Sequence, residues 1–75
     1  MSTPAQRSRL GQRILKQRQA KGWTLAQLQE ATGIDKSALS RIERGERAPE
    51  LATLRKLRDA FTLTDDEFLS WVDAA

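Results

Sequence analysis

The stretch from Thr24 to Gly45, TLAQLQEATGIDKSALSRIERG, constrains the fold of this chain more than any other segment. It contains two short helical patterns separated by a turn at Gly33, and Gly45 closes the second pattern. Thr24 begins the first pattern, and a glutamine three residues later completes a capping box, in which two backbone amides are satisfied reciprocally. These signals predict helices over residues 25–32 and 36–44, joined by a short turn.

The second pattern, KSALSRIER, has two different faces. Asp35 precedes it as a helix N-cap. Leu39 and Ile42 lie three residues apart and mark an apolar face. The rest of the helix surface carries Lys36, Ser37, Ser40, Arg41 and Arg44. We interpret the two patterns as a helix-turn-helix whose second helix enters the major groove of DNA.

Three further helical patterns surround this stretch. The first covers residues 8–21, with Ser8 as its N-cap, and residues 1–7 are expected to form a flexible arm. The others cover residues 50–61 and 65–73, the last after a second capping box. The apolar stripe of residues 50–61 consists of Leu51, Leu54, Leu57 and Phe61. Because no segment alternates with period two, the expected fold class is all-α, a five-helix bundle forming a single domain of 75 residues.

Composition excludes several classes of function. The chain has no Cys and no His, which removes disulfides, thiol catalysis and thiolate or imidazole metal sites. No Ser-His pair or other nucleophile motif is present, so we expect no enzyme, no metal and no cofactor. No apolar run approaches the roughly 20 residues of a membrane span, and the N-terminus lacks a signal-peptide core. We therefore expect a cytoplasmic protein with no membrane partner.

Charge is distributed unevenly along the chain. Residues 1–44 contain nine basic and three acidic side chains, a net charge of +6, whereas residues 45–75 contain four basic and seven acidic ones, a net charge of −3. A basic first part and an acidic second part favour one surface that binds a polyanion and another that stays away from it. Solvated helix faces are the alternative explanation of the same charges.

The order of motifs resembles that of the phage repressor and Cro family, also called the XRE family. The matching segments are LGQRI-x-x-x-R, G-W-T-x-x-x-L, G-I-D-x-S-x-L-S-R-I-E-R-G and P-E-L-x-T-L, within residues 9–69. The segment SRIERGERAP is the most specific, because it combines the end of the second helix, an acidic partner, a Gly cap and a loop Pro at fixed spacing. The resemblance implies the family's helical fold and its binding of double-stranded DNA.

The resemblance also implies roles for individual residues. Base edges would be read by Lys36, Ser37, Ser40 and Arg41. Phosphates would be bound by Thr24, Arg44 and Arg47, although ordinary surface charge is a rival explanation for the two arginines. Arg18 lies on the apolar stripe of residues 8–21, where a charge needs a partner, and it matches a family ion pair with Glu43.

Two positions depart from the family pattern. Leu25 stands where a phosphate-binding Gln is common, so one expected contact is missing. Gln29 stands where a small Ala usually lets the two helices approach, and we expect its long side chain to turn aside.

Self-association is expected at the C-terminal end, where the family pairs its subunits. The candidate interface residues are Leu69, Trp71 and Val72. We expect Trp71 to be partly exposed there, and a Trp71 folded back on the first helix is the alternative. The resulting expectation is a homodimer that binds a palindromic operator and represses transcription, with no small-molecule ligand. The rival function is a protein-interaction module, such as an antitoxin that binds a toxin and autoregulates its operon, which would need a large exposed apolar patch.

Overall fold

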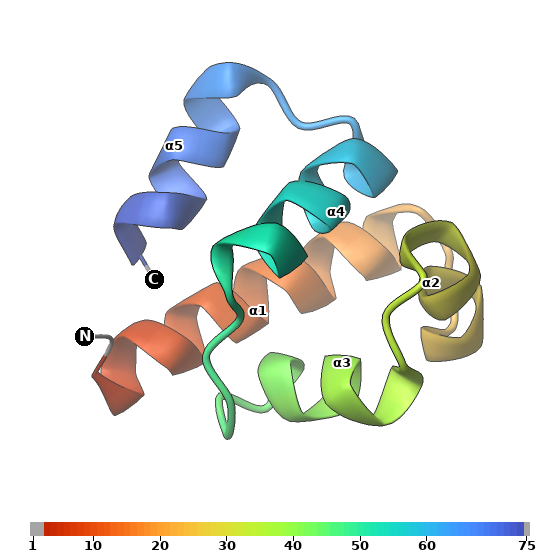
Figure 1. The fold of residues 1–75 in the computed structure, drawn as a ribbon, viewed down its shortest axis with the longest axis horizontal. Coiled ribbons are helices and arrows are strands. Elements are labelled where there is room, and N and C mark those ends of the chain that lie inside the picture. Colours follow the sequence, from red (N-terminus) through yellow and green to blue (C-terminus); the bar gives the residue numbers. More distant parts are fainter. Residues whose placement is uncertain (1–2, 75) are drawn as a thin grey trace.

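The computed structural model describes residues 3–74, which fold into five α-helices. In chain order these are α1 (Pro4–Ala20), α2 (Leu25–Thr32), α3 (Lys36–Glu43), α4 (Leu51–Phe61) and α5 (Asp65–Ala74) (Figure 1). The described residues contain no β-strand, so the predicted all-α, five-helix architecture is confirmed. No helix in this part of the chain is long and apolar enough to cross a lipid bilayer.

The first helix begins four residues earlier than predicted. Thr3 is its N-cap: the Thr3 hydroxyl accepts a hydrogen bond from the Gln6 amide at 3.1 Å, and the Gln6 side chain accepts one from the Thr3 amide at 2.7 Å. Pro4 occupies the first helical position, where its fixed φ suits a helix and its missing N–H is not needed. The predicted flexible arm is therefore wrong over residues 4–7, and residues 1 and 2 lie outside the described part of the chain.

The helix α3 ends one residue earlier than predicted, with Arg44 as its C-cap in place of Gly45. The Gly45 amide donates to the Ile42 carbonyl at 3.0 Å, and the Glu46 amide donates to the Arg41 carbonyl at 2.9 Å. This pair of hydrogen bonds is a Schellman motif. Gly45 has a φ of +75°, in the left-handed region that glycine adopts without a Cβ penalty.

The two predicted capping boxes are confirmed. Thr24 Oγ1 accepts from the Gln27 amide at 3.1 Å, and Thr64 Oγ1 accepts from the Glu67 amide at 3.2 Å. Both reciprocal hydrogen bonds, from each threonine amide to the following side chain, are also formed. These caps fix the first turns of α2 and α5 without any contribution from tertiary packing.

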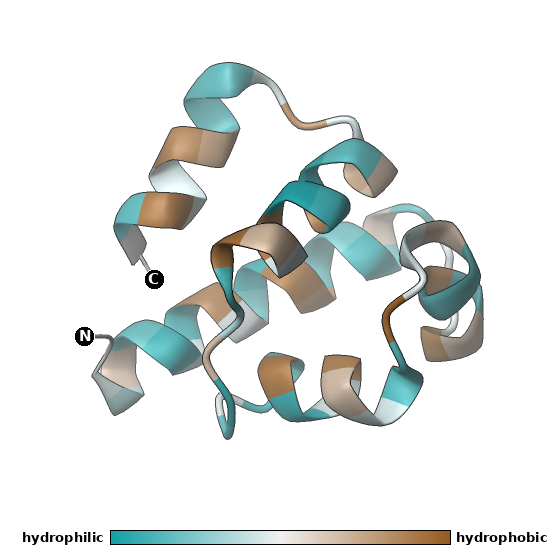
Figure 2. Cartoon of the chain, in the orientation of Figure 1, coloured by the Kyte–Doolittle hydropathy of each residue, from teal (hydrophilic) through white to brown (hydrophobic). Residues whose placement is uncertain are grey.

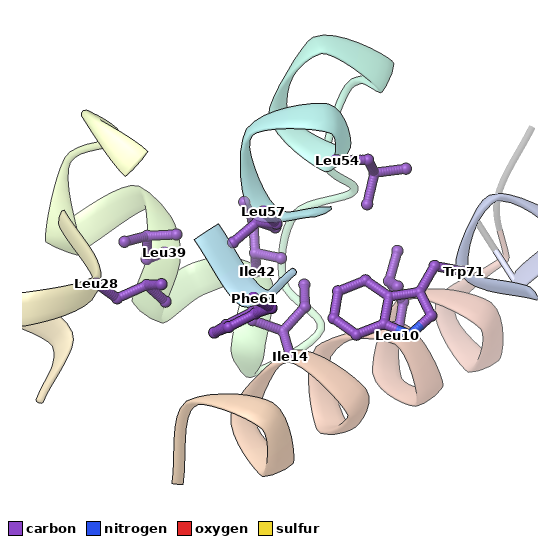
Figure 3. Packing of buried hydrophobic residues seen from close by; sticks show 9 residues of the cluster. All are labelled: Leu10, Ile14, Leu28, Leu39, Ile42, Leu54, Leu57, Phe61 and Trp71. Carbon is purple, nitrogen blue, oxygen red and sulfur yellow. The ribbon is translucent and has the colours of Figure 1, made fainter. Parts of the chain in front are cut away.

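The core draws on all five helices. In Figure 2, hydrophobic residues alternate with hydrophilic ones along each helix, as expected for helices with one buried face. The buried hydrophobic residues are Leu10, Ile14, Leu28, Leu39, Ile42, Leu54, Leu57, Phe61 and Trp71 (Figure 3). Leu51 was expected in this core but remains 48% exposed, because it occupies the first position of α4, at the end of that helix's apolar stripe.

Trp71 is a core residue, and the expectation that it is partly exposed is wrong. Only 5% of its surface is accessible, and its ring meets Phe61 edge-to-face with centroids 6.1 Å apart. Trp71 belongs to the same buried cluster as Leu10 and Ile14 of α1 (Figure 3), which agrees with the alternative expectation that it folds back on the first helix. Trp23 stacks on Phe61 with centroids 6.0 Å apart. Packing the Trp71 ring into the core buries more apolar area in the monomer than leaving it at the surface would.

The helices α1 and α3 cross in close contact at Gly11. A Cβ at this position would lie 2.4 Å from the Ile42 carbonyl oxygen and 2.5 Å from that of Glu43. Real Cβ atoms do not come so near to backbone oxygens, so only glycine permits this crossing. The long helix α1 therefore rests directly on the C-terminal turn of α3 and fixes its position.

Candidate nucleic-acid interface

One face of α3 is directed away from the core and carries most of the residues proposed to contact DNA. Lys36, Ser37 and Arg41 are exposed and Ser40 is half-buried, whereas Leu39 and Ile42 are buried. At 100° per residue the four polar residues fall within an arc of about 140°, and the two buried residues lie outside it. Two cationic side chains and two hydroxyls are thus presented together on one exposed surface.

The N-terminus of α3 is held by two side chains. The Ser37 amide donates to Asp35 Oδ2 at 2.9 Å, and the Ser37 hydroxyl donates to the same oxygen. The Lys36 amide donates to Gln29 Oε1 at 2.8 Å. The hydrogen bonds from the Ser37 hydroxyl and amide hold the pKa of Asp35 below its ordinary value, so the cap is a carboxylate at neutral pH.

The C-terminal end of α3 is tied to α1 by the Arg18–Glu43 ion pair. Arg18 Nε donates to Glu43 Oε2 at 2.7 Å, and Arg18 Nη2 donates to Glu43 Oε1 at 3.1 Å, a bidentate arrangement. The side chains are 16% and 7% exposed, and the hydrogen bonds to Glu43 raise the pKa of Arg18. Arg18 Nη1 also donates to the Trp23 carbonyl at 2.9 Å, which connects the pair to the turn before α2.

The three residues expected to bind DNA phosphates are exposed but differ in their surroundings. Thr24 lies at the N-terminus of α2, where its hydroxyl is engaged in the capping box. Arg44 is the C-cap of α3, and its Nε donates to the Ser40 carbonyl at 3.3 Å and lies 3.1 Å from Glu46 Oε2. Arg47 follows in the loop between α3 and α4.

A second charged surface lies between α1 and α5. Arg9 and Arg13 of α1, with Asp66, Leu69, Ser70 and Asp73 of α5, line an open hollow. Arg13 Nη1 donates to the Ser70 carbonyl at 3.1 Å and to the Ser70 hydroxyl at 2.8 Å. Of the predicted interface residues, Leu69 is 58% exposed and Val72 is half-buried. In the view of Figure 1 the helices α5 and α3 lie on opposite sides of the molecule.

Three contributions to this arrangement were missed by sequence reasoning. Gln29 turns aside as expected, but it turns onto the first amide of α3 instead of into solvent. Gly11 was not recognised as a crossing point, although a glycine inside a helical pattern is itself a signal of close packing. The Thr3–Pro4–Gln6 signature of a helix start was also present in the sequence.

Comparisons with known proteins agree with this geometry. A family model described as helix-turn-helix matches residues 14–68. Over 53 residues the chain is 46% identical to the HTH-type transcriptional regulator SutR of Escherichia coli (strain K12), covering 71% of this chain and 30% of SutR. Over 57 residues it is 39% identical to the uncharacterized HTH-type transcriptional regulator YazB of Bacillus subtilis (strain 168), covering 76% of this chain and 83% of YazB.

The fold is also similar to a solved structure. The crystal structure of the restriction-modification controller protein C.AhdI from Aeromonas hydrophila matches with a TM-score of 0.77 and 32% sequence identity. The match covers 83% of this chain and 94% of that one. The similarity to YazB and C.AhdI extends over most of each protein, whereas this chain spans less than a third of the length of SutR.

Proposed function

Since the chain belongs to the helix-turn-helix family of phage repressor and Cro-like (XRE-type) DNA-binding proteins, we propose that it is a transcriptional regulator that binds specific double-stranded DNA sequences through α3. The observation that carries the proposal is the exposed face of α3, on a helix held at both ends. Gln29 and Asp35 hold its N-terminus, and Arg18 holds its C-terminus through Glu43. We take residues 1–75 to act as one DNA-binding domain.

Within the proposal, the face of α3 reads base edges. Lys36 and Arg41 suit guanine, because both can donate to its O6 and N7 atoms in the major groove. Ser40 has a hydroxyl that can donate or accept. The Ser37 hydroxyl donates to Asp35, so towards a base it acts as an acceptor and suits the amino groups of adenine or cytosine.

Phosphate contacts position the protein without reading sequence. We assign them to Thr24, Arg44 and Arg47, at the start of α2 and around the loop after α3. Arg44 is held by the Ser40 carbonyl and Glu46, so on DNA its guanidinium exchanges a solvent-exposed carboxylate for a phosphate. An exposed ion pair of this kind contributes little to folding, and its rearrangement is correspondingly easy.

The active species is proposed to be a homodimer that pairs through α5. Leu69 supplies the exposed apolar side chain, with Val72 beside it, and Trp71 contributes only by fixing α5 to the core. The surrounding hollow carries both arginines and aspartates. In a two-fold symmetric interface the same patch meets itself, so opposite charges within one patch can pair across the axis. Two α3 helices would then enter successive major grooves about 34 Å apart on a palindromic operator, and promoter occlusion would cause repression.

Selection of bound sequences from a random pool of duplex DNA tests this function. The proposal predicts enrichment of a symmetric motif whose two half-sites are separated by about one helical turn. A non-symmetric motif would contradict the homodimer and leave DNA reading intact. No enrichment at all would contradict DNA reading and favour the antitoxin-like interaction module. That module has little support in the described residues, whose exposed large hydrophobic side chains are Leu51 and Leu69.

A further inference from the structure

One residue, Gln29, holds the turn between α2 and α3 from both sides. Its backbone carbonyl accepts from the Gly33 amide at 2.7 Å, which closes α2. Its side-chain oxygen accepts from the Lys36 amide at 2.8 Å, which opens α3. Among residues 3–74 this second hydrogen bond is the one that joins α2 directly to α3. A single side chain therefore links the first residue of α3 to α2, in addition to the packing of Leu28 and Leu39 in the core.

The first turn of α3 needs such partners. The first amides of a helix have no intrahelical acceptor, and in α3 these belong to Lys36, Ser37 and Ala38. Asp35 accepts from both the amide and the hydroxyl of Ser37, and the Ala38 amide also lowers the pKa of Asp35. The Lys36 amide, which Asp35 does not bind, donates to the side-chain oxygen of Gln29. This amide belongs to one of the proposed base-reading residues, so the backbone that carries the Lys36 side chain is fixed by α2.

We propose that Gln29 is a positioning residue for sequence discrimination, acting through the backbone of Lys36. The inference rests on the proposed DNA-reading function of α3. Base contacts need side chains held to within about 0.5 Å of the productive geometry, whereas attraction to phosphates tolerates larger displacements. Loosening the junction of α2 and α3 should therefore weaken binding to the preferred sequence and leave binding to unrelated DNA unchanged.

The test compares Gln29→Met with Gln29→Glu. Methionine keeps the length and helix propensity of glutamine but has no oxygen acceptor, whereas glutamate keeps the acceptor and suits the positive end of a helix. Gln12→Met is the matched control, because Gln12 is an exposed residue of α1 far from the turn in sequence. Each variant is measured for hydrogen exchange of the Lys36 amide and for the ratio of its affinities for the selected duplex and an unrelated duplex.

In Gln29→Met the Lys36 amide should exchange about two- to tenfold faster, the range expected for the loss of one hydrogen bond. The affinity ratio should fall by a similar factor. Gln29→Glu should keep both values closer to the wild type, and Gln12→Met should change neither.

The outcomes separate this inference from the proposed function. Unchanged exchange of the Lys36 amide in Gln29→Met would overturn the contact itself, whether or not the protein binds DNA. Faster exchange with an unchanged affinity ratio would overturn the positioning role. This outcome includes the case in which the affinities for both duplexes fall by the same factor. A wild-type protein with no preference for any duplex would overturn the proposed function, and with it the role of Gln29 in discrimination.

Discussion

Removing the carboxylate of Glu43 should destabilise this protein more than removing any exposed charge. In Glu43→Ala the Arg18 guanidinium, 16% exposed in the native pair, loses both of its hydrogen bonds to Glu43. Breaking a fully buried ion pair by removing one partner costs about 3–5 kcal/mol, because the other charge stays buried without compensation. Arg18 and Glu43 are partly buried, so we expect a loss near the lower end of that range, about 3 kcal/mol. A chain of this length has a free energy of unfolding of roughly 4–11 kcal/mol, at 0.05–0.15 kcal/mol per residue. The substitution should therefore remove a large part of the total stability.

Urea denaturation followed by far-UV circular dichroism measures this loss. Glu46→Ala is the matched control, since it removes a carboxylate from the Arg44–Glu46 pair, whose side chains are 60% and 55% exposed. We expect that control to change stability by less than about 1 kcal/mol.

A double variant separates the unpaired charge from lost packing. Arg18→Met with Glu43→Leu leaves no buried charge and should recover much of the loss. Recovery should be incomplete, because the Trp23 carbonyl also loses its donor. Equal effects of Glu43→Ala and Glu46→Ala, or a double variant as unstable as Glu43→Ala, would refute the reasoning.

Three further predictions concern other parts of the molecule. The pKa of Asp35 is lowered on folding, so its stabilising effect is fully present above its unfolded pKa of about 3.9 and is lost as the pH falls through the lower folded value. The difference in unfolding free energy between wild type and Asp35→Ala should thus shrink below about pH 4, and a pH-independent difference would contradict this. Gly11→Ala should cost about 1–3 kcal/mol in urea denaturation because α1 and α3 must separate, and unchanged stability would show that the crossing can relax freely. Leu69→Asp should shift sedimentation towards the monomer with helicity unchanged, and an unaltered sedimentation profile would argue against pairing through α5.

Local signals predicted the middle of the chain well. The starts of α2 and α5 follow from capping boxes, whose hydrogen bonds form between residues three apart and need no tertiary information. The end of α2 follows from Gly33, which takes the left-handed conformation. The partner of Arg18 could also be anticipated, because a charge on an apolar stripe requires compensation, and the family pattern placed Glu43 opposite it.

Tertiary relations were harder to predict. Whether Trp71 packs inward depends on the space left between α1 and α4, which no local pattern encodes. Leu51 shares the stripe of Leu54 and Leu57, and only its place at the end of α4 leaves it exposed. The contact of Gln29 with Lys36 depends on the path of the chain through a left-handed Gly33, so the sequence showed only that a long side chain must be accommodated.

The most direct test of base reading by α3 is a comparison of wild type and Arg41→Ala on the selected duplex and on its single-base variants. If Arg41 donates to a guanine, the wild type should lose about 1–3 kcal/mol of binding free energy when that base pair is changed. Arg41→Ala should lose discrimination at that base pair and keep it at the others. Arg55→Ala, which removes the same charge from an exposed position on α4, should keep discrimination everywhere. An equal loss of affinity by Arg41→Ala on every duplex, unrelated DNA included, would show that Arg41 contacts phosphate and would contradict the reading of bases by this residue.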